Sequence, residues 1–244
     1  MSRRRARRRR GDRERAGWRI FVDSIGGFLT VGWIAGAVVV VAALIAFSGS
    51  DGELSETPYV PVVRSDIDGR VEGVPGAPVR IIELSDFQCP FCRRFTLETV
   101  PTLRAEYVET GIATMEYQHF AFLGEESVRA AEAAECALEQ GAFWDYHDLL
   151  FLRQGGENEG DFSDGHLKRF ARELADAKPG FDVGAFDECL DSGRMRVEVE
   201  AQTGGARASG ISTTPSFVIN GILVTGAQPI EVFRQAIELA RSGE

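Results

Sequence analysis

The sequence predicts an α/β domain that carries a multi-helix insertion and is preceded by one N-terminal transmembrane helix. Three observations predict this fold class. A short apolar strand, a helix and a second strand follow one another between residues 79 and 119. Several helical patterns then separate these strands from a hairpin signature around residue 220. A long stretch without an ionisable side chain lies between Asp23 and Asp51.

The first 23 residues form a basic segment, which we expect to lie in the cytoplasm. Ten arginines against three acidic residues give it a net charge of +7, although the whole chain carries −10. The following residues, 24–48, are predicted to form the transmembrane helix. Their centre, from Gly26 to Phe47, is almost wholly apolar. At about 1.5 Å per residue it is long enough to cross a hydrocarbon core of about 30 Å.

Two other interpretations of this N-terminal region stay open. A cleaved signal peptide has the same order of basic, apolar and small residues, but its apolar region is only about 7 to 15 residues long. A basic cluster also suits a nucleic-acid arm. Directly before an apolar span, the arginines favour a cytoplasmic N-terminus instead. We therefore expect a single-pass protein of the cell membrane with an extracytoplasmic domain, and the acidic outer part argues against a nucleic-acid ligand.

Composition predicts where the outer domain begins. Residues 49–70 are rich in Ser, Gly, Pro, Asp and Glu and show no sustained helical or strand period, which is typical of a linker. Residues 71–244 remain, enough for one globular domain with a substantial core.

The domain starts with a strand, a helix and a second strand. Residues 79–84 form an apolar, β-branched run that reads as a buried strand. Residues 93–107 have helical composition, interrupted only by Pro101, which removes an amide donor and should kink the helix. The next strand covers about 112–119. Strand, helix and parallel strand make a right-handed crossover unit.

Helical patterns fill the next part of the chain, so we expect an insertion over about residues 122–208. Apolar residues recur at helical spacing in four or so segments, and Ser163 and Asp182 suit helix N-caps. The turn pair Asn220-Gly221 then separates two short apolar runs, which is typical of a β-hairpin. A last amphipathic helix follows it.

Cys89 and Cys92 are the candidate redox pair, because two thiols at Cys-x-x-Cys spacing can close a small, reversible disulfide. The same spacing also forms half of a zinc site. The other two cysteines, Cys136 and Cys189, form no second such pair, and the three histidines show no zinc-type spacing. We therefore expect neither a metal nor another cofactor. An oxidising compartment outside the membrane fits dithiol chemistry.

The chain resembles the DsbA-like branch of the thioredoxin-fold oxidoreductases over most of the sequence from Val79 onward. Three segments carry the resemblance in the same order: SDFQCPFC, AAEAAECALEQGAFWDYHDLLF and GISTTPSFVINGILVTGAQP. The resemblance implies a thioredoxin fold whose helical insertion helps to form a substrate groove beside the active site. It also implies exchange of disulfides with protein substrates.

In this fold Cys89 would begin a helix, where unpaired amides and the helix dipole favour a thiolate, so Cys89 is the expected nucleophile. Cys92 would resolve the mixed disulfide by attacking Cys89. The alternative is a permanent staple, but so short a loop constrains little chain entropy.

Three further positions follow from the resemblance. Pro215, with Thr214 before it, matches a cis proline that faces the cysteines and lets an extended substrate peptide pair like a strand. An ordinary trans proline is the alternative. Glu83 matches a buried acid that exchanges a proton with Cys92, and pairing with a nearby base is the alternative. Phe91 replaces the histidine of the best-known DsbA pattern, which leaves the direction of electron flow open; its ring is expected to contact substrate or the inserted helices.

Cys136 and Cys189 lie in two different inserted segments, and in an oxidising compartment we expect them to form a structural disulfide. A second redox-active pair and two buried free thiols are the alternatives. His147 reads as a helix-surface residue. His119, after the second strand, could approach the motif, but we assign it no role.

The expected function is oxidation of newly exported proteins, with a membrane redox partner that recycles the pair. There are two alternatives. The same fold could work as a reductase or isomerase, or the protein could be a membrane-tethered peptide-binding module whose cysteines are structural.

Overall fold

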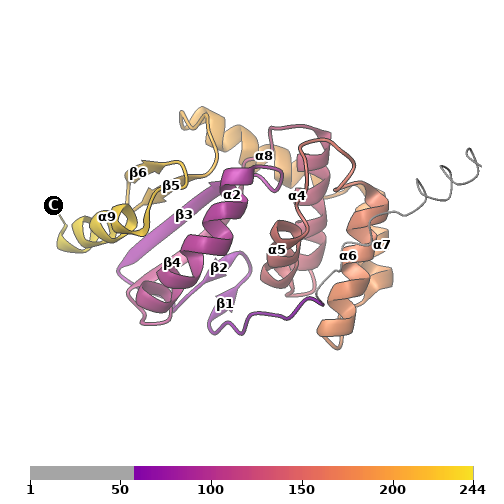
Figure 1. Cartoon of the computed structure of the whole chain (residues 1–244), viewed down its shortest axis with the longest axis horizontal. Coiled ribbons are helices and arrows are strands. Elements are labelled where there is room, and N and C mark those ends of the chain that lie inside the picture. Colours follow the sequence, from indigo (N-terminus) through magenta and orange to yellow (C-terminus); the bar gives the residue numbers. More distant parts are fainter. Residues whose placement is uncertain (1–57, 244) are drawn as a thin grey trace, which may run out of the picture. The chain divides into compact units, whose positions relative to one another are not determined.

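The structure is a computed structural model, and it describes residues 58–243 (Figure 1). Its centre is a six-stranded sheet with the strand order β1-β2-β4-β3-β5-β6. The strands are β1 (Ile67–Asp68), β2 (Val71–Glu72), β3 (Val79–Ser85), β4 (Ala113–His119), β5 (Ser216–Ile219) and β6 (Ile222–Thr225). The thioredoxin-like arrangement predicted from the sequence is confirmed.

Strands β3 and β4 run parallel, and β5 pairs antiparallel with the other side of β3. Alternate residues of β3 and β4 are fully buried on one face, so both strands present a row of inward side chains. The hairpin of β5 and β6 turns at Asn220 and Gly221, which both have positive φ angles, as a tight hairpin turn requires.

The helix after the active-site motif is irregular. It consists of α2 (Pro90–Arg94), η1 (Phe95–Thr99), α3 (Val100–Leu103) and η2 (Arg104–Val108), where η marks π-helical turns. Pro101 lies between the two π-helical turns, which fits the predicted interruption because proline lacks an amide donor. This helix and α9 (Ile230–Ser242) form one apolar core with the sheet. Both helices lie on the face of the sheet that is turned toward the viewer in Figure 1.

Five helices lie between β4 and β5, so the predicted helical insertion is confirmed. They are α4 (Glu125–Leu138), α5 (Phe143–Leu152), α6 (Asp164–Ala177), α7 (Val183–Ser192) and α8 (Arg196–Ala208). Asp182 caps α7 by accepting a hydrogen bond from the amide of Ala185 at 3.1 Å. The side chain of Ser163, the residue before α6, makes no capping bond.

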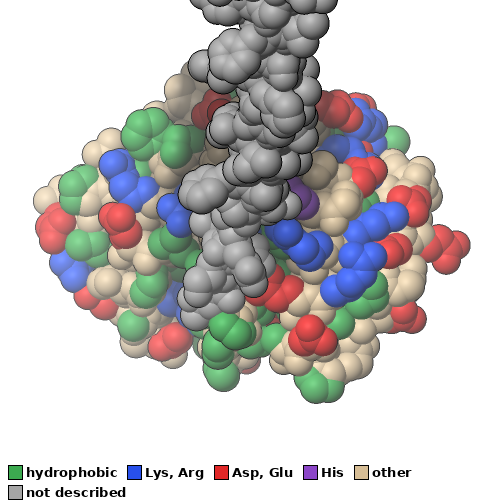
Figure 2. Space-filling model, turned by 45° about the vertical axis from the view of Figure 1, so that its right-hand side comes forward, with side chains coloured by type: hydrophobic (Ala, Val, Ile, Leu, Met, Phe, Trp, Pro, Cys, Tyr) green, Lys and Arg blue, Asp and Glu red, His purple; other side chains and the backbone are tan. Residues whose placement is uncertain are grey.

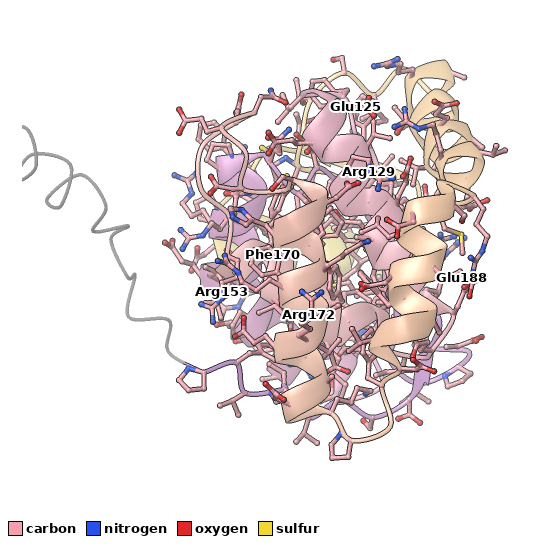
Figure 3. All side chains as sticks on the ribbon, turned by 90° about the vertical axis from the view of Figure 1, so that its right-hand side faces the viewer. Glu125, Arg129, Arg153, Phe170, Arg172 and Glu188 are labelled. Carbon is pink, nitrogen blue, oxygen red and sulfur yellow. A yellow bond between two sulfur atoms is a disulfide. The ribbon has the colours of Figure 1, made fainter. Side chains whose placement is uncertain are left out.

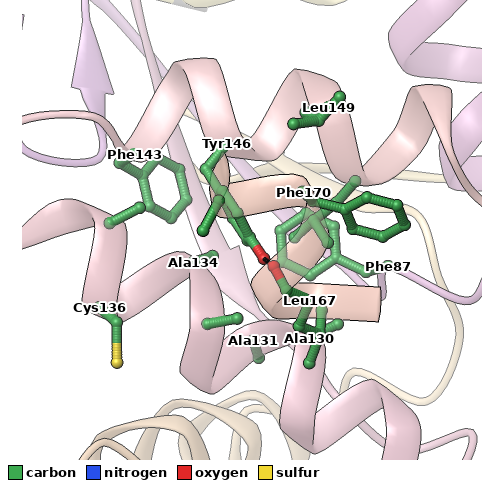
Figure 4. Packing of buried hydrophobic residues seen from close by; sticks show 14 of the residues in the cluster. Phe87, Ala130, Ala131, Ala134, Cys136, Phe143, Tyr146, Leu149, Leu167 and Phe170 are labelled. Carbon is green, nitrogen blue, oxygen red and sulfur yellow. Dashed lines mark hydrogen bonds between the residues drawn. The ribbon is translucent and has the colours of Figure 1, made fainter. Parts of the chain in front are cut away.

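The inserted helices form their own apolar core, which extends to the active-site motif. Small alanines on α4 let α5 and α6 approach closely, and the Tyr146 hydroxyl donates a hydrogen bond to the Leu167 carbonyl at 2.8 Å (Figure 4). Phe87, which precedes the motif, lies in this core together with Cys89 and Cys92. The active site therefore lies where the insertion meets the sheet.

Ion pairs join the inserted helices on the outside. Arg129 of α4 contacts Asp164 at 2.9 Å, and Figure 3 shows Arg129 and Glu125 on this side of the insertion. On the visible part of the face in Figure 2, acidic and basic side chains lie interspersed. Charges of opposite sign thus offset one another there.

Residues 58–70 were predicted to be part of a linker, and this is wrong for this stretch. The compact unit begins at Pro58, and Tyr59 is only 7% exposed. Arg64 binds both Asp148 of α5, at 2.7 Å, and Glu72 of β2, at 3.1 Å. Asp148 is 84 residues from Arg64 in the sequence, so composition gave no sign of this contact.

The predicted transmembrane helix, the basic segment and the start of the linker lie outside the described residues. Within residues 58–243, no helix combines the length and apolarity that a membrane crossing needs.

Candidate active site

Cys89 lies at the start of the active-site helix. It has an extended backbone and acts as the N-cap residue of α2, and Pro90 takes the first helical position, where a missing amide costs nothing. Cys92 follows one turn later. The two thiols differ in access: Cys92 is 0% exposed and Cys89 is 4% exposed.

The surroundings of Cys89 favour its thiolate. The hydrogen bond from the Cys92 thiol contributes most, burial opposes it, and the Thr214 side chain and the amides of Cys92 and Phe91 add to it. Together they lower the pKa of Cys89 from 9.0 to about 6. For Cys92, burial and the neighbouring Cys89 raise the pKa well above its usual value. The pair therefore holds one reactive thiolate and one protonated, sheltered thiol.

Thr214 and Pro215 lie opposite Cys89, and the peptide bond between them is cis. Cys89 Sγ is 3.5 Å from the Thr214 carbonyl oxygen, to which the thiol donates when it is protonated. The next residue, Ser216, begins β5. The structure thus brings together the two thiols and the proline segment that the sequence predicted as one site: Cys89, Cys92, Thr214 and Pro215.

Glu83 lies in the middle of the sheet and is 0% exposed. Burial raises the pKa of its carboxyl group to about 8, and the nearby Ser85 hydroxyl partly opposes this shift. Neither carboxyl oxygen has a hydrogen bond of good geometry within the described residues. The charges of Glu83 and Cys92 both act on Tyr117, so these groups share one buried region.

Asp86 anchors the loop before Cys89, a role that sequence reasoning missed. Its buried carboxylate accepts hydrogen bonds from three amides, those of Gln88 at 2.9 Å, Phe122 at 2.9 Å and Leu123 at 3.1 Å. Two of these amides belong to the segment that leads into the insertion. Asp86 therefore fixes the active-site loop to the end of β4.

Gln154, which follows α5, holds the same loop from the other side. Its amide group donates to the carbonyl of Phe87 at 2.5 Å and to that of Cys89 at 3.1 Å. Arg93 donates to the Phe151 carbonyl at 2.9 Å. A buried carbonyl without a donor is costly, so these bonds stabilise the position of the nucleophile. The signal in the sequence was only an uncharged polar residue at a helix end.

Phe91 is 53% exposed and is not among the buried side chains of the inserted helices' core. The guanidinium group of Arg94 lies 5.2 Å from the centre of its ring, within cation–π range. An aromatic face and a positive charge thus stand beside Cys89 at the surface.

Cys136 of α4 and Cys189 of α7 form a disulfide, with their Cα atoms 5.8 Å apart. It joins two inserted helices across a sequence separation of 53 residues.

The interpretation of His147 as a surface residue is wrong, since it is 2% exposed. It lies among aromatic rings on α5 and contacts Asp148 at 3.0 Å. His119 is also buried, 1% exposed, and hydrogen-bonds Glu135. Within residues 58–243, no cluster of three or more His, Cys, Asp or Glu side chains suits a metal ion.

Comparison with known proteins identifies the fold family. The family model described as thioredoxin matches residues 65–239. The chain belongs to the thioredoxin family. With a Cys-x-x-Cys pair at a helix start, this thioredoxin-family domain is a protein-disulfide oxidoreductase that resembles the DsbA branch.

Individual relatives are similar to this chain over very different shares of their own length. Disulfide bond formation protein D of Bacillus subtilis is 25% identical over 176 residues, which is 71% of this chain and 78% of that protein. The Na(+)/H(+) antiporter NhaA 1 of Salinispora arenicola is 33% identical over 175 residues, 71% of this chain but only 25% of the antiporter. The chain therefore spans about a quarter of that relative's length.

The crystal structure of oxidised BdbD from Bacillus subtilis has the same fold. It superposes with a TM-score of 0.65 at 24% identity and covers 77% of this chain and 100% of its own.

Proposed function

We propose that this protein is an extracytoplasmic thiol-disulfide oxidoreductase that introduces disulfides into exported proteins through Cys89 and Cys92. The observation that carries the proposal is the contrast between the two thiols, with the pKa of Cys89 lowered to about 6 and that of buried Cys92 raised. A thiolate that is stabilised in the reduced enzyme favours reduction of the enzyme's disulfide. The enzyme then acts as an oxidant of its substrate.

In the first step a substrate thiolate attacks Cys89 Sγ of the oxidised pair. The Cys89–Cys92 bond breaks, a mixed disulfide forms, and Cys92 leaves with the electron pair as a thiolate. The Glu83 carboxyl group, kept protonated at neutral pH by its burial, supplies the proton that Cys92 then takes up.

In the second step another substrate thiolate attacks the substrate sulfur of the mixed disulfide. Cys89 leaves as the stabilised thiolate, the substrate gains a disulfide, and two electrons remain on the enzyme as a dithiol. A membrane redox partner that accepts these electrons would restore the disulfide.

Thr214 and Pro215 are proposed to contact the substrate backbone beside the attacked sulfur, since the Thr214 carbonyl lies 3.5 Å from Cys89 Sγ. Phe91 is proposed to contact a substrate side chain, because it is exposed beside the nucleophile. The membrane location rests on the apolar segment 24–48 and on the arginines before it.

Phe91 also supports a second candidate function, a reductase or isomerase of the same fold. Phenylalanine cannot stabilise the Cys89 thiolate by charge or hydrogen bonding as histidine can, which shifts the pair towards a weaker oxidant.

Equilibration of the pair with glutathione buffers separates the two functions. A reduction potential nearer to about −120 mV than to thioredoxin's about −270 mV supports the oxidase. A value near about −270 mV contradicts it and favours the reductase. A pair that never exchanges with glutathione contradicts both and leaves a peptide-binding module with structural cysteines.

A further inference from the structure

A cavity of about 220 Å³ lies along the active-site helix, and neither thiol lines it. Three segments that are far apart in the sequence form it: residues 59–64, the helix between Thr96 and Arg104, and α5. In Figure 1 the first of these segments runs below α5 on its way to β1. Its apolar side chains include Val60, Val62, Leu97, Val100, Pro101 and Leu152.

The rim of this cavity is unusually apolar for a protein surface. Val60, Val62, Leu97 and Leu152 all line the cavity and are exposed, although their side chains are large and apolar. Single exposed apolar side chains are ordinary, but four that gather around one hollow are typical of a binding site.

Arg64 is held rigidly at the cavity and keeps one nitrogen without a partner. Its Nε donates to Glu72 at 3.1 Å and its Nη2 to Asp148 at 2.7 Å, and its side chain is only 4% exposed. Nη1 is buried and has no hydrogen-bond partner in the described part of the chain. Because a guanidinium group is planar, fixing Nε and Nη2 also fixes the direction of the two Nη1 hydrogens. A buried donor that cannot turn away is costly unless an acceptor comes from outside the fold.

Thr96 supplies a second polar group without a partner. It lines the cavity from the π-helical turn η1, is 7% exposed, and its hydroxyl makes no hydrogen bond within residues 58–243. A threonine hydroxyl in a helix can bond a carbonyl one turn back, but this one does not. π-Helical turns are rare and are frequently found at functional sites.

The Tyr59 hydroxyl is a different case. Burial raises its pKa, and the charges of Asp148 and Asp145 raise it further, so acceptors for this group already lie nearby. The groups that need an external acceptor are therefore Arg64 Nη1 and the Thr96 hydroxyl.

The charges at the cavity balance, which restricts the ligand to a neutral one. Arg64 and Arg104 are positive, and their largely buried partners Glu72 and Asp148 are negative. A ligand carboxylate would add an uncompensated negative charge beside Asp148, which is unfavourable at a buried site. A neutral carbonyl oxygen accepts hydrogen bonds without adding a charge.

The volume restricts the size of the ligand. A cavity of about 150 Å³ holds benzene, and a water molecule occupies about 30 Å³ in the liquid. The cavity of about 220 Å³ therefore suits a fused two-ring molecule of about ten non-hydrogen atoms. Water is a poor filling for it, because most of the lining offers no hydrogen bond.

We propose that this cavity binds a neutral, mostly apolar ring ketone, whose carbonyl oxygen accepts hydrogen bonds from Arg64 Nη1 and the Thr96 hydroxyl. The apolar rings then cover the exposed side chains of the rim. Disulfide exchange at Cys89 uses none of these groups, so the inference goes beyond the proposed function and does not depend on it.

The test uses three probes of similar shape with the oxidised full-length protein in lipid nanodiscs. They are 1-indanone, which has the carbonyl oxygen, indane, which lacks it, and indane-1-carboxylate, which is charged. Methyl NMR signals of Val62, Leu97 and Leu152 report binding at the cavity. Leu223 of β6 and Leu239 of α9 are also exposed but do not line it, so their signals report adventitious contacts.

We expect 1-indanone to bind with a Kd of about 0.1 to 1 mM, as suits a molecule of its size. Indane and the carboxylate should bind at least about fivefold more weakly, because one offers no acceptor and the other brings a charge. Equal binding of 1-indanone and indane, or equal shifts at Leu223 and Leu239, would mean an adventitious additive only and would overturn the proposal. No shift with 1-indanone up to about 5 mM would overturn it as well.

Thr96→Val tests the polar contact at nearly unchanged shape. Thr99→Val is its matched control, since it makes the same change on the same π-helical turn at a residue that does not line the cavity. We expect Thr96→Val to weaken binding of 1-indanone about three- to tenfold and to leave indane unchanged, while Thr99→Val matches the wild type. Wild-type affinity for 1-indanone in Thr96→Val, or an equal loss in Thr99→Val, would contradict the assignment.

Unfolding in urea without any probe gives a readout that separates ligand binding from a structural role of Thr96. Because its hydroxyl has no partner in the fold, Thr96→Val should unfold at the same urea concentration as the wild type or at a higher one. A lower midpoint would show that the hydroxyl stabilises the fold itself, which removes the reason to assign it to a ligand. If Thr96→Val does not fold at all, the comparison of 1-indanone with indane in the wild type still decides the proposal.

Discussion

Replacement of Cys92 by alanine tests the physical origin of the Cys89 thiolate. The Cys92 thiol is the largest contributor to the lowered pKa of Cys89, which is about 6 rather than 9.0. At pH 7 the lowered value makes about 90% of Cys89 thiolate, against about 1% for an unperturbed thiol. Without the Cys92 hydrogen bond, we expect the pKa to rise by at least about one unit.

The higher pKa of Cys89 lowers the reaction rate at low pH and raises it at high pH. Well below the pKa, one unit lowers the thiolate fraction about tenfold, while the more basic thiolate is about threefold more nucleophilic, so the net rate falls about threefold. Above both pKa values the thiolate fraction is complete in both proteins. The variant then reacts about threefold faster, and the two pH–rate profiles cross.

The assay is alkylation of the reduced proteins by iodoacetamide between pH 4.5 and pH 9. Cys92 is buried and has a raised pKa, so the wild-type rate reports Cys89. Thr214→Val serves as a second variant, since it removes a smaller contribution and should shift the profile less in the same direction. A wild-type midpoint near 9.0, the pKa of the thiol without these interactions, would refute the reasoning, as would profiles that coincide.

Three further predictions concern stability and the support of the site. Glu83 has a folded-state pKa of about 8 against a usual 4.5, so its stabilising contribution is complete below pH 4.5 and is lost as pH rises through 8. Glu83→Gln should therefore unfold at higher urea than the wild type by a margin that grows over this window, to about 3 kcal/mol at pH 7. Glu188→Gln at an exposed position of α7 (Figure 3) serves as the matched control, and a margin for Glu83→Gln that does not change with pH would contradict the assignment. Joint replacement of Cys136 and Cys189 by alanine opens a loop with a sequence separation of 53 residues and should cost about 4 kcal/mol of unfolding free energy, whereas a loss below about 1 kcal/mol would speak against a structural role. Gln154→Ala leaves the Phe87 carbonyl of the active-site loop without its donor, whereas the Cys89 carbonyl keeps the hydrogen bond from the Arg93 amide at 3.1 Å. We expect a loss of about 2 kcal/mol in the free energy of unfolding in urea and slower disulfide exchange, and wild-type values would show that the loop is stable without Gln154.

The parts of the site that the sequence predicted are those with a local signal. The spacing of Cys89 and Cys92, and the strand before them, are visible within a few residues, and the resemblance supplied Pro215 as their partner. His147 shows the limit of this reasoning. His147 sits on a helix that is covered on most sides, so a helical pattern alone misplaced it at the surface.

The missed features depend on partners far along the chain. Gln154 and the Cys89 carbonyl are 65 residues apart, and Arg64 and Asp148 are 84 apart. From composition alone, residues 58–70 were predicted to be a polar linker. Their ion pairs depend on where both partners lie in the fold, and neither residue signals such a pair alone. The fold class was predictable because periodicity is a property of contiguous residues.

Trapping of mixed disulfides tests the central claim, that Cys89 exchanges disulfides with protein substrates, most directly. In the full-length protein, Cys92→Ala removes the thiol that resolves the intermediate, and Cys89→Ala removes the nucleophile. We predict that Cys92→Ala accumulates covalent adducts through Cys89 that a reducing agent dissolves, and that Cys89→Ala forms none. Absence of adducts in Cys92→Ala, or equal adducts in both variants, would contradict the account.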